Sequence, residues 1–276
     1  MSGGQRTEAR TAVRVGSGGR EAASLELIRE EPLLIRIADR DYAVVMRTPG
    51  EERPLAAGFC LAEGIIDGPQ DLATVGYDAR ADPNTIDIWL APERQRRVAA
   101  LLERRGFVSQ TSCGVCGKAL IADLQQRCEP ATDDLVVGGD TLRACIAELD
   151  SRQQLYRTTR GSHAALLFDA QARLIALAED VGRHNALDKA VGRALLDGRL
   201  DAARIVMLSS RNSYELVQKA ARAGLPVVIS NSRPTALAVA LGEGLNLTLV
   251  FPDGQALVVA CGPQRIAGAA APGARS

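Results

Sequence analysis

The 276-residue chain has few lysines and histidines and only 3% aromatic residues. Three of its 33 basic residues are lysine (Lys118, Lys189 and Lys219), and its two histidines are His163 and His184. The 33 basic residues face 33 acidic ones, so the formal net charge at pH 7 is zero. A chain without excess positive charge is not expected to have nucleic acid or an anionic membrane as its main partner.

Sequence signals for secretion, membrane insertion and common nucleotide folds are also missing. Residues 1–22 hold no apolar core of a signal peptide, and no run reaches the roughly 18 apolar residues of a spanning helix. We therefore expect a cytoplasmic protein, in which thiols stay reduced and the six cysteines form no disulfide framework. Neither a P-loop nor a G-x-G-x-x-G motif is present, which disfavours an ordinary ATP or NAD fold.

The pattern of predicted elements divides the chain into five parts. Residues 1–22 and 267–276 are expected to be flexible tails, because they are rich in small and polar residues. Residues 23–110 alternate short aliphatic runs with helical segments and form an N-terminal α+β portion. Residues 111–128 hold a cysteine-containing loop and the helix after it, and residues 129–266 form an α/β core that binds a ligand.

The α/β core is predicted to be a layered, mixed β-sheet with helices on both faces. Residues 163–168 and 173–178 form a predicted hairpin. Predicted strands 205–208 and 226–229 follow, and each leads into a helix. With two final strands, this order of elements is that of an α/β domain.

Cys113 and Cys116 are the strongest candidates for chemistry. They lie two residues apart in a glycine-rich segment, directly before Lys118 and a predicted helix. The helix N-terminus and Lys118 would lower the pKa of the nearer thiol, and the thiolate is the nucleophile. The spacing fits a dithiol redox centre, half of a zinc site, or a sulfur-relay site in which one cysteine carries a persulfide.

Neither of the first two alternatives has the residues that usually accompany it. A thioredoxin-like redox centre would lie in a βαβ unit with a tryptophan before the first cysteine, and no such unit surrounds Cys113 and Cys116. A zinc site would need more ligands, but Cys128 stands alone and both histidines are remote, so no metal site is predicted. The remaining cysteines, Cys60, Cys128, Cys145 and Cys261, are expected to be structural.

Polar side chains recur at three predicted strand-to-helix junctions. Hydroxyl groups, arginines and free backbone N–H groups at a helix N-terminus are the composition of a phosphate site. The residues concerned are Arg183, His184 and Asn185 at the first junction, Ser209, Ser210 and Arg211 at the second, and Ser230 and Ser232 at the third. Three such junctions along one sheet edge predict a ligand with several phosphates.

The same junctions carry local predictions about helix ends and side-chain pairs. Asn212 can cap the helix after the second junction, with Glu215 as its capping-box partner. Pro234 is placed in the first turn of the helix after the third junction. Asp188 lies one helical turn after His184, a spacing at which side chains meet.

The three lysines lie beside these candidate elements. Lys118 follows the cysteine pair, and Lys189 lies in the predicted helix 185–196. Lys219 lies in the predicted helix 213–223, either near the candidate site or on a solvent-exposed face of that helix. The ammonium group of lysine is compact, whereas the guanidinium group of arginine is planar and wide, so the two are not interchangeable in a binding site.

Taken together, these stretches resemble the formate dehydrogenase accessory sulfurtransferase family, FdhD. The matching stretches are residues 46–49, 58–59, 63–66, 112–117, 161–165, 179–189, 213–219, 234–235 and 237–239. The resemblance spans about residues 24 to 266 and implies a cytidine-deaminase-like α/β fold. It also implies a cytoplasmic homodimer that acts on the molybdenum bis(molybdopterin guanine dinucleotide) cofactor before that cofactor enters formate dehydrogenase.

The resemblance also assigns roles to residues. Cys113 would take persulfide sulfur from a cysteine desulfurase and pass it to the bound cofactor, with Cys116 assisting. The family's cofactor-binding turn corresponds to Phe251, Pro252, Asp253, Gly254 and Gln255. Here the turn is one residue short and lacks the usual basic residue.

The resemblance implies that the protein is a sulfurtransferase with a persulfide intermediate. Such a protein can also be described as a sulfur carrier. The deaminase-like fold does not imply deamination, because the zinc pattern H-x-E with P-C-x-x-C is absent. Two alternatives stay open. One is a cofactor-binding chaperone without obligatory sulfur transfer, and the other is a dithiol oxidoreductase.

Overall fold

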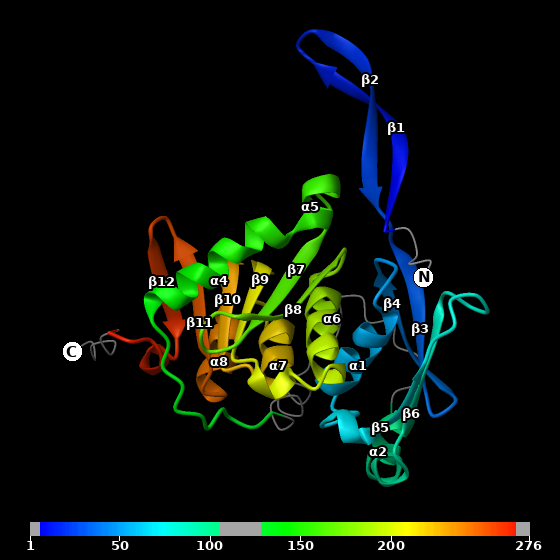
Figure 1. Ribbon diagram of the computed structural model, residues 1–276, viewed down its shortest axis with the longest axis vertical. Coiled ribbons are helices and arrows are strands. Elements are labelled where there is room, and N and C mark those ends of the chain that lie inside the picture. Colours follow the sequence, from blue (N-terminus) through cyan, green and yellow to red (C-terminus); the bar gives the residue numbers. More distant parts are fainter. Residues whose placement is uncertain (1–5, 105–127, 269–276) are drawn as a thin grey trace.

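The structure is a computed structural model that describes residues 6–104 and 128–268. Its largest sheet has six strands, in the order β12-β11-β10-β9-β7-β8 (Figure 1). The strands are β7 (His163–Phe168), β8 (Leu174–Asp180), β9 (Ile205–Arg211), β10 (Val227–Ser232), β11 (Thr248–Asp253) and β12 (Ala256–Cys261). β9, β10 and β11 are parallel, whereas β7, β8 and β12 pair antiparallel with their neighbours. The predicted mixed sheet is confirmed.

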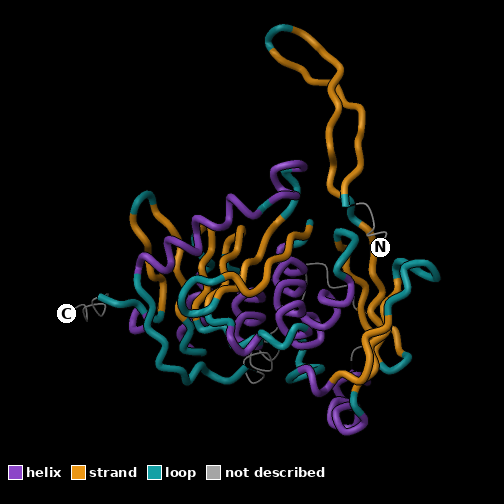
Figure 2. Tube along the Cα trace, in the orientation of Figure 1, coloured by secondary structure: helices purple, strands orange, loops and turns teal. Residues whose placement is uncertain are grey.

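Helices cover both faces of this sheet, as the sequence predicts (Figures 1 and 2). One face packs against α4 (Gly139–Arg152), and the other against α6 (Arg183–Leu196), α7 (Tyr214–Arg222) and α8 (Ala236–Gly244). Successive side chains of a strand point to opposite faces, so Leu166 joins the α4 core while Leu167 joins the core on the other side. Burial on both faces explains why these strands are continuous apolar runs.

A second, four-stranded sheet forms the N-terminal portion, in the order β4-β3-β6-β5. Its strands are β3 (Glu31–Ile37), β4 (Arg40–Arg47), β5 (Leu72–Gly76) and β6 (Thr85–Leu90), and its helices are α1 (Glu52–Ala62) and α2 (Pro92–Arg104). Helix α1 packs against α6, so the apolar core runs without a break from this sheet into the six-stranded one. The two portions therefore share one core.

Two glycines allow α1 and α6 to approach closely. A Cβ atom on Gly58 would lie 1.9 Å from the backbone oxygen of Asp188, and one on Gly192 would lie 1.9 Å from that of Pro54. Backbone atoms on both sides leave no side chain that could rotate away. The helix crossing thus depends on glycine at both positions.

A buried polar cluster of Thr48, Asp180 and Lys189 joins the same two portions. The Nζ atom of Lys189 lies 2.6 Å from an oxygen of Asp180 and donates to the backbone oxygen of Thr48 at 2.7 Å. The backbone N–H of Thr48 donates to Asp180 at 3.0 Å, and its hydroxyl accepts from Val181 N–H at 3.0 Å. Lys189, Asp180 and Thr48 are all 0% exposed. Each charge is therefore paired and hydrogen-bonded, as burial requires.

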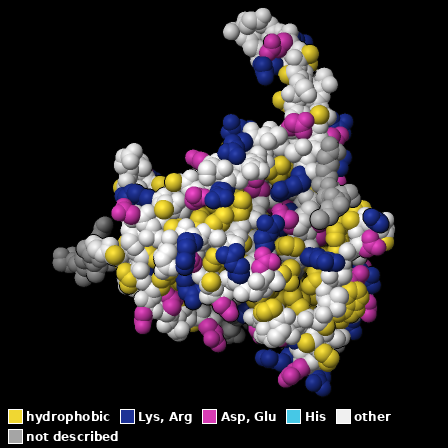
Figure 3. All heavy atoms as spheres, viewed as in Figure 1, with side chains coloured by type: hydrophobic (Ala, Val, Ile, Leu, Met, Phe, Trp, Pro, Cys, Tyr) yellow, Lys and Arg dark blue, Asp and Glu magenta, His cyan; other side chains and the backbone are white. Residues whose placement is uncertain are grey.

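Residues 7–28 form an antiparallel hairpin, although residues 1–22 were expected to be a tail. Strand β1 (Thr7–Gly16) pairs with β2 (Gly19–Ile28) along its whole length, and the hairpin stands clear of the body (Figure 3). Ser17 and Gly18, which belong to the composition that indicates a tail, form the turn instead, and Gly19 beside them takes a positive φ of 117°. Figure 3 also shows basic and acidic side chains interspersed over this face of the molecule.

Helix α4 ends at its C-cap Gln153, and a second short helix, α5 (Gln154–Thr159), begins directly after it. The buried carboxylate of Glu179 accepts from the backbone N–H groups of Leu155 and Tyr156, at 2.8 and 2.9 Å. A carboxylate at these N–H groups satisfies the start of a new helix. Short 3-10 turns at Pro69–Asp71, Leu200–Ala202 and Pro263–Arg265 complete the described elements. None of the helices in the described ranges is long and apolar enough to cross a membrane.

Candidate functional site

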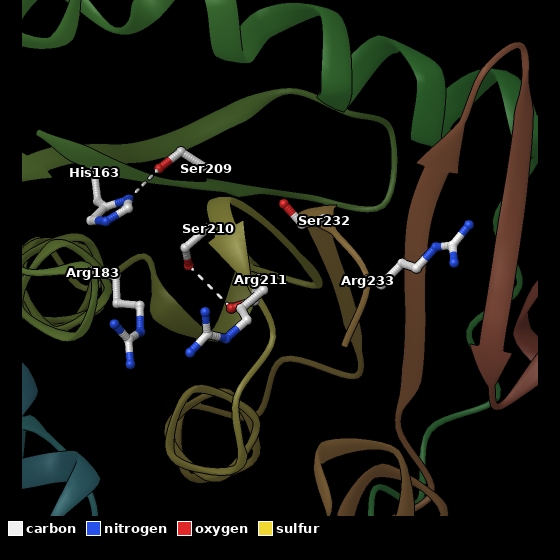
Figure 4. Close-up of a pocket in the computed structure, with 7 residues that line it drawn as sticks. All are labelled: His163, Arg183, Ser209, Ser210, Arg211, Ser232 and Arg233. Atoms are coloured by element: carbon white, nitrogen blue, oxygen red, sulfur yellow. Dashed lines mark hydrogen bonds between the residues drawn. The ribbon is translucent and has the colours of Figure 1, made fainter. Parts of the chain in front are cut away.

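A cavity of about 570 Å³ opens where the parallel strands β9 and β10 end. Its lining comes from the start of β7, the start of α6 and the ends of β9 and β10 (Figure 4). The lining residues are His163, Arg183, Ser209, Ser210, Arg211, Ser232 and Arg233. Ligands of open α/β sheets bind at this carboxyl edge, because loops diverge there and leave a crevice. The structure thus brings together residues from all three predicted junctions.

The cavity is electropositive because, among the described residues, three arginines and no acidic residue line it. Within the described ranges, no salt bridge joins Arg183 or Arg211 to a carboxylate, although the charge of Arg183 acts on Glu215. Both guanidinium groups extend into the same space (Figure 4). Arg233 extends beyond Ser232 towards β11 and lies 3.9 Å from Asp253. Unpaired guanidinium groups facing one space repel each other until an anion lies between them.

The side chain of Ser209 connects β9 to β7 inside the cavity. Its Oγ accepts from the backbone N–H of Ala164 at 2.8 Å and lies 3.3 Å from Nδ1 of His163. Burial lowers the pKa of His163, and the nearby charges of Arg183 and His184 lower it further. The imidazole therefore favours its neutral form.

Three predicted binding residues face other partners. Nε2 of His184 lies 2.8 Å from the Glu215 carboxylate, which lowers the pKa of Glu215. The Asn185 amide donates to the backbone oxygen of Met46 at 2.6 Å and to Asp180 at 3.1 Å. The buried Ser230 hydroxyl donates to the backbone oxygen of Ser232 at 2.8 Å. These three side chains support the edge of the cavity and do not line it.

The predicted capping box of Asn212 and Glu215 is wrong. Ser213 is the N-cap of α7, without a side-chain hydrogen bond, and the buried Asn212 amide has no partner in the described ranges. Glu215 turns to His184 instead. Pro234 likewise precedes the N-cap of α8, because Thr235 holds that position and its hydroxyl accepts from Ala238 N–H.

The predicted contact between His184 and Asp188 is not formed, because each of them pairs with a residue of α7. Both oxygens of Asp188 lie 2.8 Å from Nζ of Lys219, so the solvated face considered for Lys219 is not where its ammonium lies. Burial raises the pKa of Asp188, while Lys219 and His184 oppose the shift. The pairs Asp188–Lys219 and His184–Glu215 therefore join α6 to α7.

The predicted cofactor-binding turn joins β11 and β12 beside the cavity. Phe251 is buried, Pro252 is half-buried, and Asp253, Gly254 and Gln255 are exposed. Gly254 takes a positive φ of 60°, which the tight turn requires. The ion pair between Asp253 and Arg233 connects this turn to the lining of the cavity.

The sequence analysis assigns no binding role to two of the lining residues, His163 and Arg233. Arg233 belongs to the third junction and shares its composition signal. His163 lies at the start of an antiparallel strand, where no junction signal exists. Only the pairing of β7 with β9, which sets Ala165 opposite Leu208, brings His163 to the carboxyl end of β9.

Cys113, Cys116 and Lys118 lie outside the described residues. The other four cysteines are buried, which confirms that they are structural. Burial raises the thiol pKa of all four, to about 12 for Cys145 and about 11 for Cys261. Raised pKa values leave little thiolate near neutral pH. In the described ranges, no group of three or more His, Cys, Asp or Glu residues is placed to hold a metal ion.

Comparison with known proteins identifies the family. The sequence profile of the FdhD/NarQ family matches residues 28–267. The chain belongs to the FdhD/NarQ family. It is 40% identical over 255 residues to a "Sulfur carrier protein FdhD" of Mycolicibacterium paratuberculosis, with 89% of this chain and 93% of that protein covered. It is 38% identical over 275 residues to the protein of the same name from Streptomyces avermitilis, with 96% and 97% covered.

A solved structure supports the fold of this FdhD/NarQ family member. A crystal structure of a candidate formate dehydrogenase accessory protein from Desulfotalea psychrophila superposes with a TM-score of 0.76. The alignment covers 95% of this chain and 100% of the other, at 23% sequence identity. At that identity, the likeness establishes a shared fold.

Proposed function

We propose that this FdhD/NarQ family member is a sulfurtransferase that carries sulfur to a molybdenum cofactor. It would accept persulfide sulfur from a cysteine desulfurase and deliver it to molybdenum bis(molybdopterin guanine dinucleotide) before insertion into apo-formate dehydrogenase. The names of its relatives, "Sulfur carrier protein FdhD", support the carrier role. The arginine-lined cavity is the observation in the structure that carries the proposal.

The cavity has the chemistry to bind the phosphates of this substrate. Each guanine dinucleotide moiety holds a pyrophosphate, and guanidinium groups match phosphate oxygens with paired N–H donors. No salt bridge in the described ranges joins Arg183 or Arg211 to a carboxylate, so a phosphate would be the first anion in direct contact with them. The hydroxyl of Ser232 lies in the same cavity and adds a neutral donor, whereas the Ser210 hydroxyl donates to the backbone oxygen of Arg211 at 3.2 Å.

The cysteine pair supplies the sulfur chemistry of the proposal. The Cys113 thiolate attacks the terminal sulfur of the desulfurase persulfide, forms a new S–S bond, and releases the desulfurase cysteine as a thiol. The carried sulfur must then gain two electrons to leave as sulfide. Attack by the Cys116 thiolate on the Cys113 sulfur provides them, because the pair closes to a disulfide as sulfide departs. A cellular dithiol then reduces the pair for the next cycle.

Mass spectrometry tests the loading step directly. After incubation with a cysteine desulfurase and cysteine, the wild-type peptide containing Cys113 is expected to gain about 32 Da, the mass of one sulfur. Cys113→Ala should lose this adduct, and Cys145→Ala, a matched change at a buried thiol, should keep it. Absence of the adduct on the wild-type peptide would exclude sulfur transfer through this residue.

Restoration of formate dehydrogenase activity in cells that lack the protein separates the alternatives. We expect Cys113→Ala to abolish activation, because the four cysteines in the described ranges are buried and cannot replace Cys113 as the sulfur acceptor. A cofactor-binding chaperone without sulfur transfer predicts full activation by Cys113→Ala. A dithiol oxidoreductase predicts catalytic reduction or oxidation of a protein disulfide by the purified wild-type protein.

Replacement of Arg211 by methionine is expected to weaken binding of guanosine diphosphate about tenfold, because one charge-assisted pair with phosphate is lost. The dependence of affinity on salt should also become shallower, because fewer charges contact the ligand. Isothermal titration calorimetry at several salt concentrations measures both effects. Arg143→Met on the exposed side of α4 is the control, and equal effects of the two changes would contradict a phosphate site at Arg211.

A further inference from the structure

We infer that His163 is the neutral hydrogen-bond donor of this cavity: Ser209 holds its imidazole as the Nε2–H tautomer, and Nε2–H binds an acceptor atom of the ligand. The identity of the ligand rests on the proposed function, whereas the tautomer does not. His163 would thereby be a specificity-determining residue. It complements the arginines, which supply charge.

The hydrogen bonds around Ser209 determine the tautomer. A serine hydroxyl has one proton to donate and two lone pairs to accept with. Ala164 N–H occupies one lone pair at 2.8 Å, and Nδ1 of His163, at 3.3 Å, is the one further partner of Ser209 in the described ranges. If Nδ1–H donated to the second lone pair instead, the hydroxyl proton of Ser209 would have no acceptor in the described ranges. The arrangement that gives this proton a partner directs it to Nδ1, which accepts it. A neutral imidazole with Nδ1 as acceptor carries its own proton on Nε2.

The charges that face His163 favour the neutral ring. Arg183 and His184 at the start of α6 oppose a second positive charge, and burial acts in the same direction. Asp180 at the end of β8 favours the charged form, but it is already bonded to Lys189, Thr48, Gly182 and Asn185. The balance lowers the pKa of His163 from its ordinary value, so the ring stays neutral at neutral pH.

The free nitrogen of the ring belongs to the cavity. Nε2 of His163 has no hydrogen-bond partner in the described ranges, and the ring lines the same space as Arg183 and Arg211 (Figure 4). Guanidinium groups attract any nearby anion, whereas one N–H bond on a packed ring selects an acceptor at one position and one angle. A phosphate or carbonyl oxygen fits Nε2–H, and a second donor does not.

Nitrogen NMR spectroscopy on the ¹⁵N-labelled protein tests the tautomer without any ligand. The chain has two histidines, and His184→Gln removes the signals of the other ring. At pH 7.5 we expect a protonated, pyrrole-type Nε2 and an unprotonated, pyridine-type Nδ1 for His163. Ser209→Ala should give a mixture of tautomers. A wild-type ring protonated at Nδ1, or at both nitrogens, would overturn the inference.

Two substitutions of His163 test the contact with guanosine diphosphate by calorimetry. Glutamine can place an amide N–H₂ near the position of Nε2, whereas asparagine places its amide near that of Nδ1. We expect His163→Asn to weaken binding about tenfold and His163→Gln to stay within about threefold of wild type. Thermal melting confirms that each variant is folded, and the wild-type NMR result stands whether or not they are.

The outcomes separate this inference from the proposed function. If the wild type binds guanosine diphosphate and His163→Asn binds it equally well, the inference fails and the phosphate site stands. If the wild type shows no binding, the proposed phosphate site fails, and the ligand role of His163 fails with it. Loss of affinity in His163→Asn alone, with the expected tautomer, supports both.

Discussion

Replacing Gly192 by alanine is expected to destabilise the protein by about 3 kcal/mol, the upper end of the usual range for overpacking a core. The new Cβ would lie 1.9 Å from the Pro54 backbone oxygen and 2.7 Å from the Gly58 backbone nitrogen. Neither atom can rotate away, so α6 must move off α1. That movement would open the core that both portions of the chain share. Urea unfolding followed by circular dichroism measures the effect.

Gly244→Ala is the matched control, because Gly244 is also a helical glycine. It lies at the end of α8, and a Cβ there would meet no atom within 4 Å. Alanine favours the helix over glycine, so this variant should be as stable as wild type or more stable by up to about 1 kcal/mol. If Gly192→Ala unfolds at the same urea concentration as Gly244→Ala, the close crossing of α1 and α6 is contradicted.

Gly58→Ala gives an independent check on the same crossing. Its Cβ would meet the Asp188 backbone oxygen at 1.9 Å, on the opposite side of the helix pair. Separation of the helices relieves both clashes at once. The double variant should therefore lose less stability than the sum of the single ones, as expected for coupled sites.

The α/β core could be predicted from the sequence because each of its elements has a pattern of its own. Strands β9 and β10 are apolar runs that end in serines, and each is followed by helical periodicity. The carboxyl ends of parallel strands share one edge, so the polar residues after them had to meet. Ser209, Arg211 and Ser232 line the cavity for this reason.

The hairpin at residues 7–28 could not be predicted because neither of its faces is buried against the core. Most of its side chains are exposed on both faces. A strand buried on one face alternates apolar and polar residues, and this alternation is the usual sequence signal for a strand. Without it, the composition of residues 1–22 indicates a tail.

The partners of the charged residues around the site could also not be predicted from the sequence. His184 and Asp188 lie at a spacing that favours contact within one helix, yet each pairs with a residue of α7. Local spacing states which groups can meet, whereas the packing of α6 against α7 decides which do meet. The lysines show the same limit. Lysine is rare in this sequence, but only the structure shows that the ammonium groups of Lys189 and Lys219 pair with buried carboxylates.

Replacing Lys189 by methionine is expected to destabilise the protein by about 3–5 kcal/mol, the range for breaking a buried ion pair from one side. Methionine fills much of the same volume but leaves the carboxylate of Asp180 without its cation, at 0% exposure. It also removes the donor to the Thr48 backbone oxygen, so the link between the β4–α1 and β8–α6 connections weakens. Urea unfolding of the full-length protein measures the loss.

Lys189→Arg keeps the charge and tests the shape of the site. The ammonium lies 2.6 Å from Asp180 and 2.7 Å from the Thr48 oxygen, in a space closed to solvent. A guanidinium group is wider and carries five donors, so burying it there leaves donors unpaired and forces the two connections apart. We expect this variant to lose at least about 2 kcal/mol of stability and to restore formate dehydrogenase activity less well than the exposed control Arg143→Lys. Equal stability of the two variants would show that the buried cluster of Thr48, Asp180 and residue 189 accepts either cation. The structure would then not require lysine at residue 189.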